Sequence, residues 1–254
     1  TYKSKEFFIE SLKAKNLAKT YKTPLYCYSY DKIRENIEKF KNTFKSVNPT
    51  FCFAVKANPN TILLREIKKL GFGADVVSIG ELMKALKAGI NPNKIVFSGV
   101  GKTSSEISFA IDKKILLINA ESLSEVKEIN KIAKLKNKKV RIGIRLNPNT
   151  DARTLSQIST GKKENKFGVN EKTFYEIIDF CKNSKNIDLN CLSVHIGSQI
   201  LDHKPYEKML KVVDNILKKT SHEFEYIDLG GGMGIAYTDN NKKLNYKKYN
   251  LAIK

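Results

Sequence analysis

The sequence predicts an α/β fold, a (β/α)8 barrel of the TIM type with about seven of its eight strands present in the 254 residues. Apolar runs of strand length alternate with amphipathic segments of helical period, which is the pattern of repeated strand-helix units. The strand-like runs are apolar throughout, as parallel strands covered on both faces are. A polar residue or a glycine closes nearly every run, and in a barrel those positions converge on one mouth.

Seven strands and the helices between them can be read along the chain in order. The strands are expected at residues 51–57, 74–79, 94–99, 115–120, 140–147, 191–197 and 226–232. The helices with apolar residues three and four positions apart are expected at 61–71, 80–89, 122–136, 171–183 and 206–220. Units of this kind build either a doubly wound sheet or a barrel.

The strand ends decide between these two architectures. Their closing residues are Lys56, Asp75, Ser98 with Gly99, Asn119, Arg145 with Asn147, His195, and Gly230 to Gly232. A doubly wound sheet gathers its ligand groups mainly at one switch point and often has a glycine fingerprint after its first strand. Here the glycine run follows the seventh strand, where barrels frequently bind phosphate, so we expect the barrel.

The charge balance does not indicate a nucleic-acid binder. The chain has 46 Lys plus Arg against 26 Asp plus Glu, a formal net charge of +20. Only five of these cations are arginine, and the lysines are spread over every expected helix with glutamates between them. Because base and phosphate readers usually use the arginine fork, we expect solvated helix faces and no nucleic-acid partner.

The spacing of the cysteines and the length of the apolar runs bear on three expectations: the metal content, the membrane association and the cellular compartment. Cys27, Cys52, Cys181 and Cys191 form no CxxC pair and no zinc-ligand spacing, so we expect buried free thiols and no metal. No apolar stretch reaches the ~20 residues that span a bilayer, and residues 1–13 have no signal-peptide core. We expect a cytoplasmic protein without a membrane partner.

A single lysine closes the apolar run FCFAVKANPN at residues 51–60. At a strand end inside a mostly apolar mouth, Lys56 would lose hydration, which favours the neutral amine. A neutral amine can form a Schiff base with an aldehyde. The alternative is one more solvated lysine in a lysine-rich chain.

Two later segments supply a ring and an anion cradle. GGGMG at 230–234 lets backbone N–H groups approach an anion closely, although a tight turn would need the same glycines. HIGSQ at 195–199 sets an imidazole at a strand end beside the hydroxyl of Ser198, although a packed structural histidine fits as well. An amine, a flat ring and a phosphate site on one rim suit pyridoxal phosphate.

Several segments resemble those of one enzyme family. FCFAVKAN, GADVVSIGEL, IVFSGVGKT, NPNTDARTLSQISTGKKENKFGV, VHIGSQI and IDLGGGMGI resemble, in the same order, segments of the diaminopimelate decarboxylases. Those are pyridoxal-phosphate enzymes with an alanine-racemase-like barrel, and the resemblance covers nearly the whole chain.

The resemblance implies a role for each candidate site residue. Lys56 is expected to form the Schiff base with pyridoxal 5'-phosphate and His195 to stack on the cofactor ring. Ser198 and the backbone of Gly230, Gly231 and Gly232 are expected to hold the phosphate. The resemblance also sets three polar side chains on the cofactor side of the barrel, namely Asp75, Glu81 and Arg145; for these, ordinary ion pairs at the rim are the alternative.

The resemblance further implies decarboxylation of meso-2,6-diaminopimelate to L-lysine and carbon dioxide, the last step of lysine biosynthesis, by a homodimer. Another barrel decarboxylase, acting on arginine, ornithine or carboxynorspermidine, is the first alternative. A non-catalytic pyridoxal-phosphate carrier is the second, and a cationic nucleic-acid binder without a recognisable motif is the third.

The chain departs from the family pattern at two places. Leu155, Ser156 and Gln157 stand where relatives commonly have His-Pro-Tyr before ISTG. An eighth strand and a C-terminal β domain are expected to be missing, so that 31–254 would form an incomplete pyridoxal-phosphate-binding barrel. Residues 1–30, through a strand at 23–30, would contribute to the missing domain. These residues alone are expected to show little or no turnover.

Overall fold

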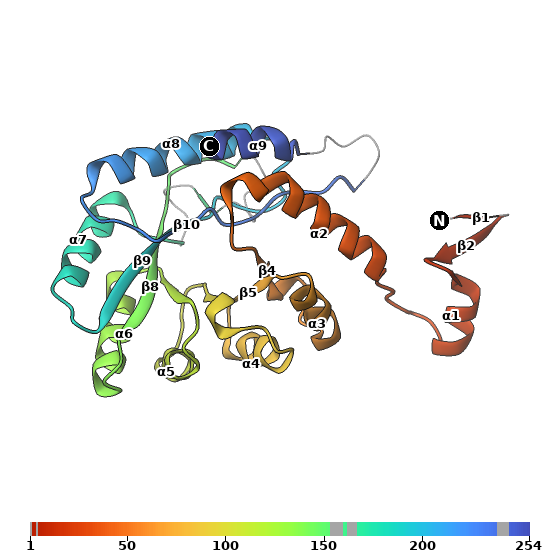
Figure 1. Cartoon of the computed structure of the whole chain (residues 1–254), viewed down its shortest axis with the longest axis horizontal. Coiled ribbons are helices and arrows are strands. Elements are labelled where there is room, and N and C mark those ends of the chain that lie inside the picture. The colour runs from red at the N-terminus through yellow and green to blue at the C-terminus, as the bar shows by residue number, and fades with distance from the viewer. Residues whose placement is uncertain (1, 4, 153–159, 162–166, 238–243) are drawn as a thin grey trace. The chain divides into compact units, whose positions relative to one another are not determined.

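The computed structural model describes residues 2–3, 5–152, 160–161, 167–237 and 244–254. The chain divides into two compact units, Thr1–Asn48 and Pro49–Lys254, and each is described by itself (Figure 1).

The first unit combines a small antiparallel sheet with two helices. The sheet joins β1 (Tyr2–Lys3), β2 (Glu6–Ile9) and β3 (Leu12–Lys13), and the helices are α1 (Ala14–Tyr21) and α2 (Tyr30–Phe44). Ser29 caps α2 by accepting from the Lys32 N–H at 3.1 Å, and its hydroxyl donates to Glu10 at 2.8 Å. Glu10 therefore ties the β2–β3 turn to the start of α2.

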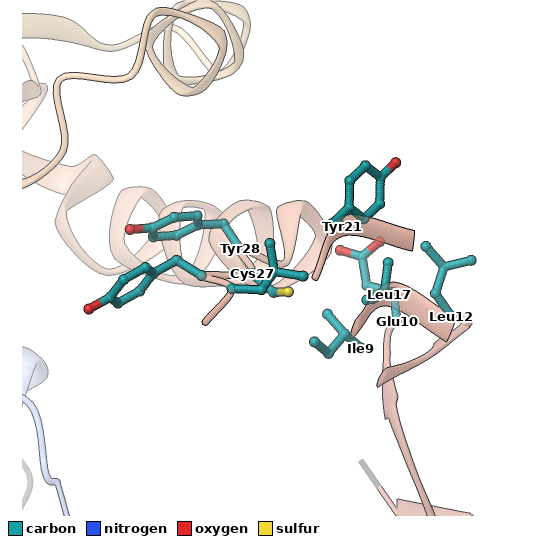
Figure 2. Close-up of a pocket in the computed structure, with 9 residues that line it drawn as sticks. Ile9, Glu10, Leu12, Leu17, Tyr21, Cys27 and Tyr28 are labelled. Carbon is teal, nitrogen blue, oxygen red and sulfur yellow. The ribbon is translucent and has the colours of Figure 1, made fainter. Parts of the chain in front are cut away.

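Residues 23–29 of this unit form no strand, and Tyr30 already begins α2. The segment instead lines a largely apolar pocket, together with side chains from β2, β3 and α1 (Figure 2). Cys27 lies in this pocket and is exposed, so the expectation of a buried thiol is wrong there, because no strand carries it into a core. Cys181 and Cys191 are buried as expected, Cys52 is partly buried, and all four are free thiols. Whether residues 1–30 contribute a strand to a further domain stays a prediction.

The second unit contains one parallel sheet of seven strands. They are β4 (Cys52–Ala54), β5 (Gly73–Val76), β6 (Ile95–Phe97), β7 (Leu117–Ala120), β8 (Val140–Leu146), β9 (Ile187–Val194) and β10 (Tyr226–Asp228). Each strand pairs with its neighbour in sequence, with β4 and β10 at the two edges of the described sheet. A doubly wound sheet reverses its strand order at a switch point, and this sheet does not, so the barrel class is confirmed.

Helices follow the strands and cover the outside of the sheet (Figure 1). They are α3 (Thr61–Lys69), α4 (Ile79–Lys87), α5 (Ser104–Lys113), α6 (Leu123–Leu135), α7 (Glu171–Lys182), α8 (Lys204–Lys219) and α9 (Tyr246–Ile253). Each buries the apolar positions of its period: α6, for example, buries Val126, Ile129, Ile132 and Ala133.

The sheet curls as a barrel wall does. Cys52 on β4 and Tyr226 on β10 pack against the same buried cluster of Val96, Leu116, Leu117 and Cys191. Asp228 on β10 also helps to raise the pKa of the Cys52 thiol to about 12, after the larger effect of burial. The two edge strands therefore face a common interior.

A repeated cap begins three consecutive helices at the carboxyl ends of β5, β6 and β7. Ser78, Thr103 and Ser122 each accept a hydrogen bond from the N–H of a glutamate three residues later. These glutamates are Glu81, Glu106 and Glu125, and their carboxylates reach back to backbone N–H groups of the strand-helix loops. The loops that frame the candidate site are thus held by their own helix caps.

Candidate functional site

Lys56 lies on a short 3-10 turn, Val55–Ala57, directly after β4. Asn60 begins α3 just beyond it, accepting from the Ile62 N–H at 2.9 Å, so the chain turns sharply after the lysine. The side chain is exposed and forms no hydrogen bond or ion pair with any residue that the structure describes. The expectation that Lys56 is buried away from water is therefore wrong here, because β4 is an edge strand of the described sheet.

Asp75 lies beside Lys56 on the next strand, where the backbone pairing sets it opposite Ala54. Ser98 donates to its carboxylate at 2.6 Å. Burial raises the pKa of Asp75 to about 6; the Ser98 bond and the charge of Lys56 act against the rise, while Asp228 and Glu81 add to it. Lys56 and Asp75 therefore share one electrostatic environment.

A polar network continues from Asp75 across the interior of the sheet. The Asn119 amide donates to Ser98 at 3.3 Å, to Ser193 at 3.4 Å and to Asp228 at 3.1 Å. Ser193 also donates to Asp228 at 2.8 Å. Asp228 is a site residue that the sequence analysis missed, although its position at the end of the seventh strand, directly before the glycine run, is a usable signal.

His195 follows β9 and contacts the glycine run that follows β10. The Gly231 N–H donates to Nδ1 at 3.3 Å, so Nδ1 is an acceptor and the proton of the neutral ring sits on Nε2. Burial, followed by the charges of Arg145 and Lys56, lowers the pKa of His195 to about 3. At neutral pH the imidazole is uncharged, and its pKa responds to the Lys56 charge although the two residues follow different strands of the sheet.

The glycines of the run are required by close contacts. A Cβ on Gly232 would lie 1.7 Å from the Gly197 oxygen, and one on Gly230 would lie 2.7 Å from Nδ1 of His195. Both glycines also have positive φ, +80° and +66°. Gly231 differs, because a Cβ there would meet nothing within 4 Å. The run thus packs on His195 with one side and leaves space at Gly231 on the other.

Arg145 projects from β8 and is held by a carboxylate. Its Nη1 donates to Glu121 at 3.0 Å, and its guanidinium lies 4.8 Å from the centre of the Phe167 ring. The other oxygen of Glu121 accepts the Gly168 N–H at 3.0 Å. Glu121 is the second site residue that the sequence analysis missed, since a glutamate just before a helix carries no distinctive pattern.

Among the described residues, Glu81 forms no hydrogen bond or ion pair with Lys56 or His195. Its carboxylate accepts the Val77 N–H at 3.0 Å, which is a local role at the start of α4. It reaches the site only through its charge, which adds to the raised pKa of Asp75.

Thr160 and Gly161, the described part of ISTG, pack against HIGSQ. Thr160 donates its hydroxyl to the His195 carbonyl at 2.9 Å, and its N–H donates to the Ile196 carbonyl at 3.1 Å. A Cβ on Gly161 would lie 3.0 Å from Cα of Ile196. Leu155, Ser156 and Gln157 lie outside the described residues.

The donor set fits a pyridoxal phosphate group. In the described part of the chain, the Lys56 amine, the Ser198 hydroxyl and the Gly232 N–H have no hydrogen-bond partner, whereas Asp75, Glu81, Arg145 and His195 are already engaged. An amine, a neutral ring and free donors beside an open glycine are what an aldehyde, a pyridine ring and a phosphate need. Among the same described residues, no group of three or more His, Cys, Asp or Glu could hold a metal ion.

Comparison with known families agrees with this geometry. Residues 30–254 match the family model described as "Pyridoxal-dependent decarboxylase, pyridoxal binding domain". The chain therefore belongs to the pyridoxal-dependent decarboxylases, through the domain that binds their cofactor.

Two relatives of known activity are similar to this chain. The diaminopimelate decarboxylase of Helicobacter pylori strain J99 is 46% identical over 224 residues, 87% of this chain and 55% of the relative. That of Aquifex aeolicus is 42% identical over 246 residues, 95% of this chain and 58% of the relative. The chain thus spans a little over half the length of these relatives.

Two solved structures of diaminopimelate decarboxylases are also similar to this chain. A crystal structure of Helicobacter pylori diaminopimelate decarboxylase complexed with L-lysine matches with a TM-score of 0.91 and 43% identity, over 94% of this chain and 61% of that one. A diaminopimelate decarboxylase structure from M. jannaschii matches with a TM-score of 0.93 and 35% identity, over 100% of this chain and 61% of that one.

In the part of the chain that the structure describes, no helix is long and apolar enough to cross a membrane.

Proposed function

We propose that this chain forms the pyridoxal-phosphate-binding part of a diaminopimelate decarboxylase, which converts meso-2,6-diaminopimelate into L-lysine and carbon dioxide. The observation that carries the proposal is that Lys56, which has no hydrogen-bond or ion-pair partner among the described residues, follows a strand at the same end of the parallel sheet as the neutral His195 and the glycine run that contacts it. The identity to diaminopimelate decarboxylases, 46% and 42% for two of them, supports the substrate. A relative's structure in complex with L-lysine supports the product.

The proposed site residues divide into those that hold the cofactor and those that set its surroundings. Lys56 would bind the aldehyde carbon through its amine, and His195 would lie against the ring as a neutral imidazole. Ser198 and the backbone of Gly230, Gly231 and Gly232 would hold the phosphate, with the free N–H of Gly232 as a donor. Asp75, Glu81 and Arg145 would set the charge around them.

When bound, pyridoxal phosphate supplies an aldehyde that captures amines and a ring that accepts the electron pair left by departing carbon dioxide. The amine of Lys56 must first lose its proton, since only the neutral form is a nucleophile. Asp75, whose charge and that of Lys56 influence each other, holds a proton more readily than an ordinary carboxylate because its pKa is raised to about 6. His195 remains uncharged, so that its ring packs without adding a cation beside the cofactor.

We also propose that the protein acts in the cytoplasm as a homodimer and without a nucleic-acid partner. The family resemblance supports the homodimer, and the scarcity of arginine supports the absence of nucleic acid. Light scattering coupled to size exclusion measures the first, and titration of labelled DNA or RNA at two salt concentrations measures the second.

Pyridoxal phosphate binding and carbon dioxide release test the proposal in two steps. The protein is mixed with the cofactor, and the visible absorbance of the bound form is followed for wild type, Lys56→Ala and Lys87→Ala. The absorbance should develop in wild type and in Lys87→Ala, whose exposed lysine lies on α4, and be lost in Lys56→Ala.

Because these residues alone are expected to show little or no turnover, substrate choice is then measured on the full-length protein with meso-diaminopimelate, arginine, ornithine and carboxynorspermidine. Carbon dioxide released fastest from meso-diaminopimelate supports the proposal. Preference for any of the other three assigns the chain to a different barrel decarboxylase, and binding without turnover of any of them favours the carrier.

A further inference from the structure

Four charged side chains form a continuous network at the carboxyl ends of β6, β7 and β8. They are Lys102, Glu125, Glu121 and Arg145, and the Lys102 side chain is only 2% exposed while that of Glu121 is 3% exposed. Of the four, only Arg145 is among the residues proposed to surround the cofactor, and Glu121 reaches the site by holding it. The other three have no role in the proposed chemistry, yet they are buried and fully engaged.

Lys102 joins two strand ends. Its Nζ donates to the Gly99 carbonyl at 2.6 Å, to the Asn119 carbonyl at 2.7 Å and to the Glu125 carboxylate at 2.7 Å. All three N–H bonds of the ammonium are thereby used. The ends of β6 and β7 are held together by one cation.

Glu125 connects Lys102 to the backbone of Glu121. Its second carboxylate oxygen accepts the backbone N–H of Glu121 at 2.8 Å, while its own N–H is bound by Ser122, the cap of α6. The backbone of Glu121 is therefore fixed from the side of α6. Its side chain is then directed across to β8.

Glu121 holds two groups with its two oxygens. One accepts from Arg145 Nη1 at 3.0 Å, and the other accepts from the Gly168 N–H at 3.0 Å. Phe167, next to Gly168, packs on the Arg145 guanidinium, and the Val169 N–H donates to the Arg145 carbonyl at 2.8 Å. Glu121 thus connects the arginine to the segment that returns to β8 at residues 167–169.

The position of Arg145 matters for His195. In the pairing of β8 with β9, the last pair is Leu146 opposite Val194. Arg145 comes just before this pair on β8, and His195 comes just after it at the end of β9. The Arg145 charge is also the largest contribution, after burial, to the lowered pKa of His195. A displaced guanidinium would change the charge around the imidazole.

A buried ion network of this kind is poor evidence of a stabilising role. Desolvation of four charges offsets most of their attraction, and apolar replacements are often as stable. The network instead fixes the geometry of these side chains, because each carboxylate oxygen and each N–H named above has one assigned partner.

We propose that Glu121 is a positioning residue for the pyridoxal site, which holds the Arg145 guanidinium beside His195 and fixes residues 167–169, with Lys102 and Glu125 fixing Glu121. The inference rests on the proposed function for its cofactor, but its contacts to Gly168 exist without it. Glu121 itself touches no reacting group.

Three variants test the inference: Glu121→Gln, Glu121→Asp and, as matched control, Glu176→Gln, which removes an exposed carboxylate on α7. Amide hydrogen exchange at residues 167–169 is measured in the cofactor-free protein, and the dissociation constant for pyridoxal phosphate is measured by absorbance titration. Glu121→Gln should speed exchange at Gly168 by about tenfold or more and weaken cofactor binding by a similar factor, because one charged acceptor is lost. Glu121→Asp should recover part of both losses, and Glu176→Gln should match wild type.

The two measurements separate the inference from the proposed function. Wild-type exchange at Gly168 in Glu121→Gln, or an equal loss of cofactor affinity in Glu176→Gln, overturns the positioning role. Failure of wild type to bind pyridoxal phosphate overturns the proposed function, while the exchange measurement still decides whether Glu121 holds residues 167–169. Should Glu121→Gln fold poorly, Glu121→Asp is compared with a fourth variant, Lys102→Met, which removes the cation that fixes Glu125. Normal exchange together with normal affinity in both variants overturns the role.

Discussion

At the scale of single residues, the site sorts its ionisable groups by their surroundings. His195 is kept neutral by burial and two nearby cations, whereas Asp75 binds its proton more tightly because burial outweighs the help from Ser98 and Lys56. Lys56 is exposed and unpartnered within the described residues. An exposed amine whose environment includes a carboxylate with a raised pKa and a neutral ring is suited to capture an aldehyde that arrives from solvent.

Asp75 gives a prediction about stability and pH. Its folded pKa of about 6 lies above the ordinary 3.8, so its favourable contribution is present below pH 3.8 and is lost as pH rises through 6. Asp75→Asn should therefore raise the free energy of unfolding at neutral pH by up to about 3 kcal/mol, since each pKa unit corresponds to about 1.4 kcal/mol, and change it little near pH ~4. Urea unfolding of the cofactor-free protein at the two pH values measures the difference.

An exposed aspartate provides the opposite case. Asp112 accepts from Lys136 at 2.6 Å and Lys138 at 2.8 Å, and these bonds lower its pKa to about 2. Asp112→Asn should lower stability at neutral pH, in the direction opposite to Asp75→Asn. Destabilisation of both variants at neutral pH would contradict the charge assigned to Asp75.

The individual residues were predicted unequally well from the sequence. Lys56, His195 and the glycine run stand at strand ends, which makes them candidates, but their proposed roles came from the family resemblance because type and position left structural alternatives open. Asp228 and Glu121 look like ordinary acidic residues, and only their partners across the sheet, Asn119 with Ser193 for one and Arg145 with Gly168 for the other, reveal them.

At the scale of elements, hydrogen bonds from two neighbouring segments hold the glycine run. Gly232 accepts the Ile200 N–H at 2.9 Å, and the Gly234 N–H returns a bond to Ile200 at 2.9 Å, so the loops after β9 and β10 lie against each other. Tyr206 of α8 also donates to the Gly231 carbonyl at 3.0 Å. The backbone that would hold a phosphate is therefore held by hydrogen bonds from two sides, the loop after β9 and helix α8.

Alanine substitutions within the run should separate packing from open space. Gly232→Ala forces a Cβ to 1.7 Å from the Gly197 oxygen at a φ of +80°, so we expect a loss of roughly 2 to 4 kcal/mol in the free energy of unfolding. Gly231→Ala meets nothing within 4 Å, and we expect a change within about 0.5 kcal/mol. Urea unfolding of the two variants measures the contrast.

Gly231→Ala is informative in a second way. Because its methyl group would enter the open side of the run, it should weaken pyridoxal phosphate binding while leaving the cofactor-free protein stable. Equal stability of the two variants would contradict the close approach of Gly232 to Gly197.

The elements themselves were largely predictable, and the exceptions have physical reasons. The strand expected at 191–197 begins earlier, at Ile187, because residues 187–190 alternate between buried and partly buried positions and do not form an apolar run. The segment 23–30 has β-forming residues but no partner strand in the described part of the chain, so propensity alone did not make it a strand.

At the scale of the whole molecule, the sequential strand order and the shared interior of β4 and β10 define the architecture. The sequence predicts this because polar strand ends recur after every strand, which only a barrel gathers at one mouth. It does not predict the long-range contacts that set the site, since the pair Asn119 and Asp228 is 109 residues apart. Such contacts depend on the curl of the whole sheet.

The net charge of +20 gives a prediction about salt for the whole chain. Surface ion pairs such as Lys218 with Asp214 each contribute little to the free energy of unfolding. The excess cationic side chains, in contrast, repel one another across the folded surface. Raising sodium chloride from about 20 mM to about 200 mM shortens the screening length from roughly 20 Å to 7 Å, so repulsion should weaken more than the short ion pairs do. We expect a stability gain on the order of 1 kcal/mol, seen as a rise of about 2 to 4 °C in the unfolding midpoint.

The matched control for this salt response lowers the net charge without touching an ion pair. It replaces three exposed lysines that have no ion pair among the described residues, Lys84, Lys87 and Lys127, by glutamine, which should reduce the response to salt. Sulfate and phosphate are avoided because they stabilise folded proteins by exclusion and would also compete for the anion site. A midpoint that falls with added sodium chloride would mean that attractive pairs, and not net repulsion, govern the electrostatics of this protein.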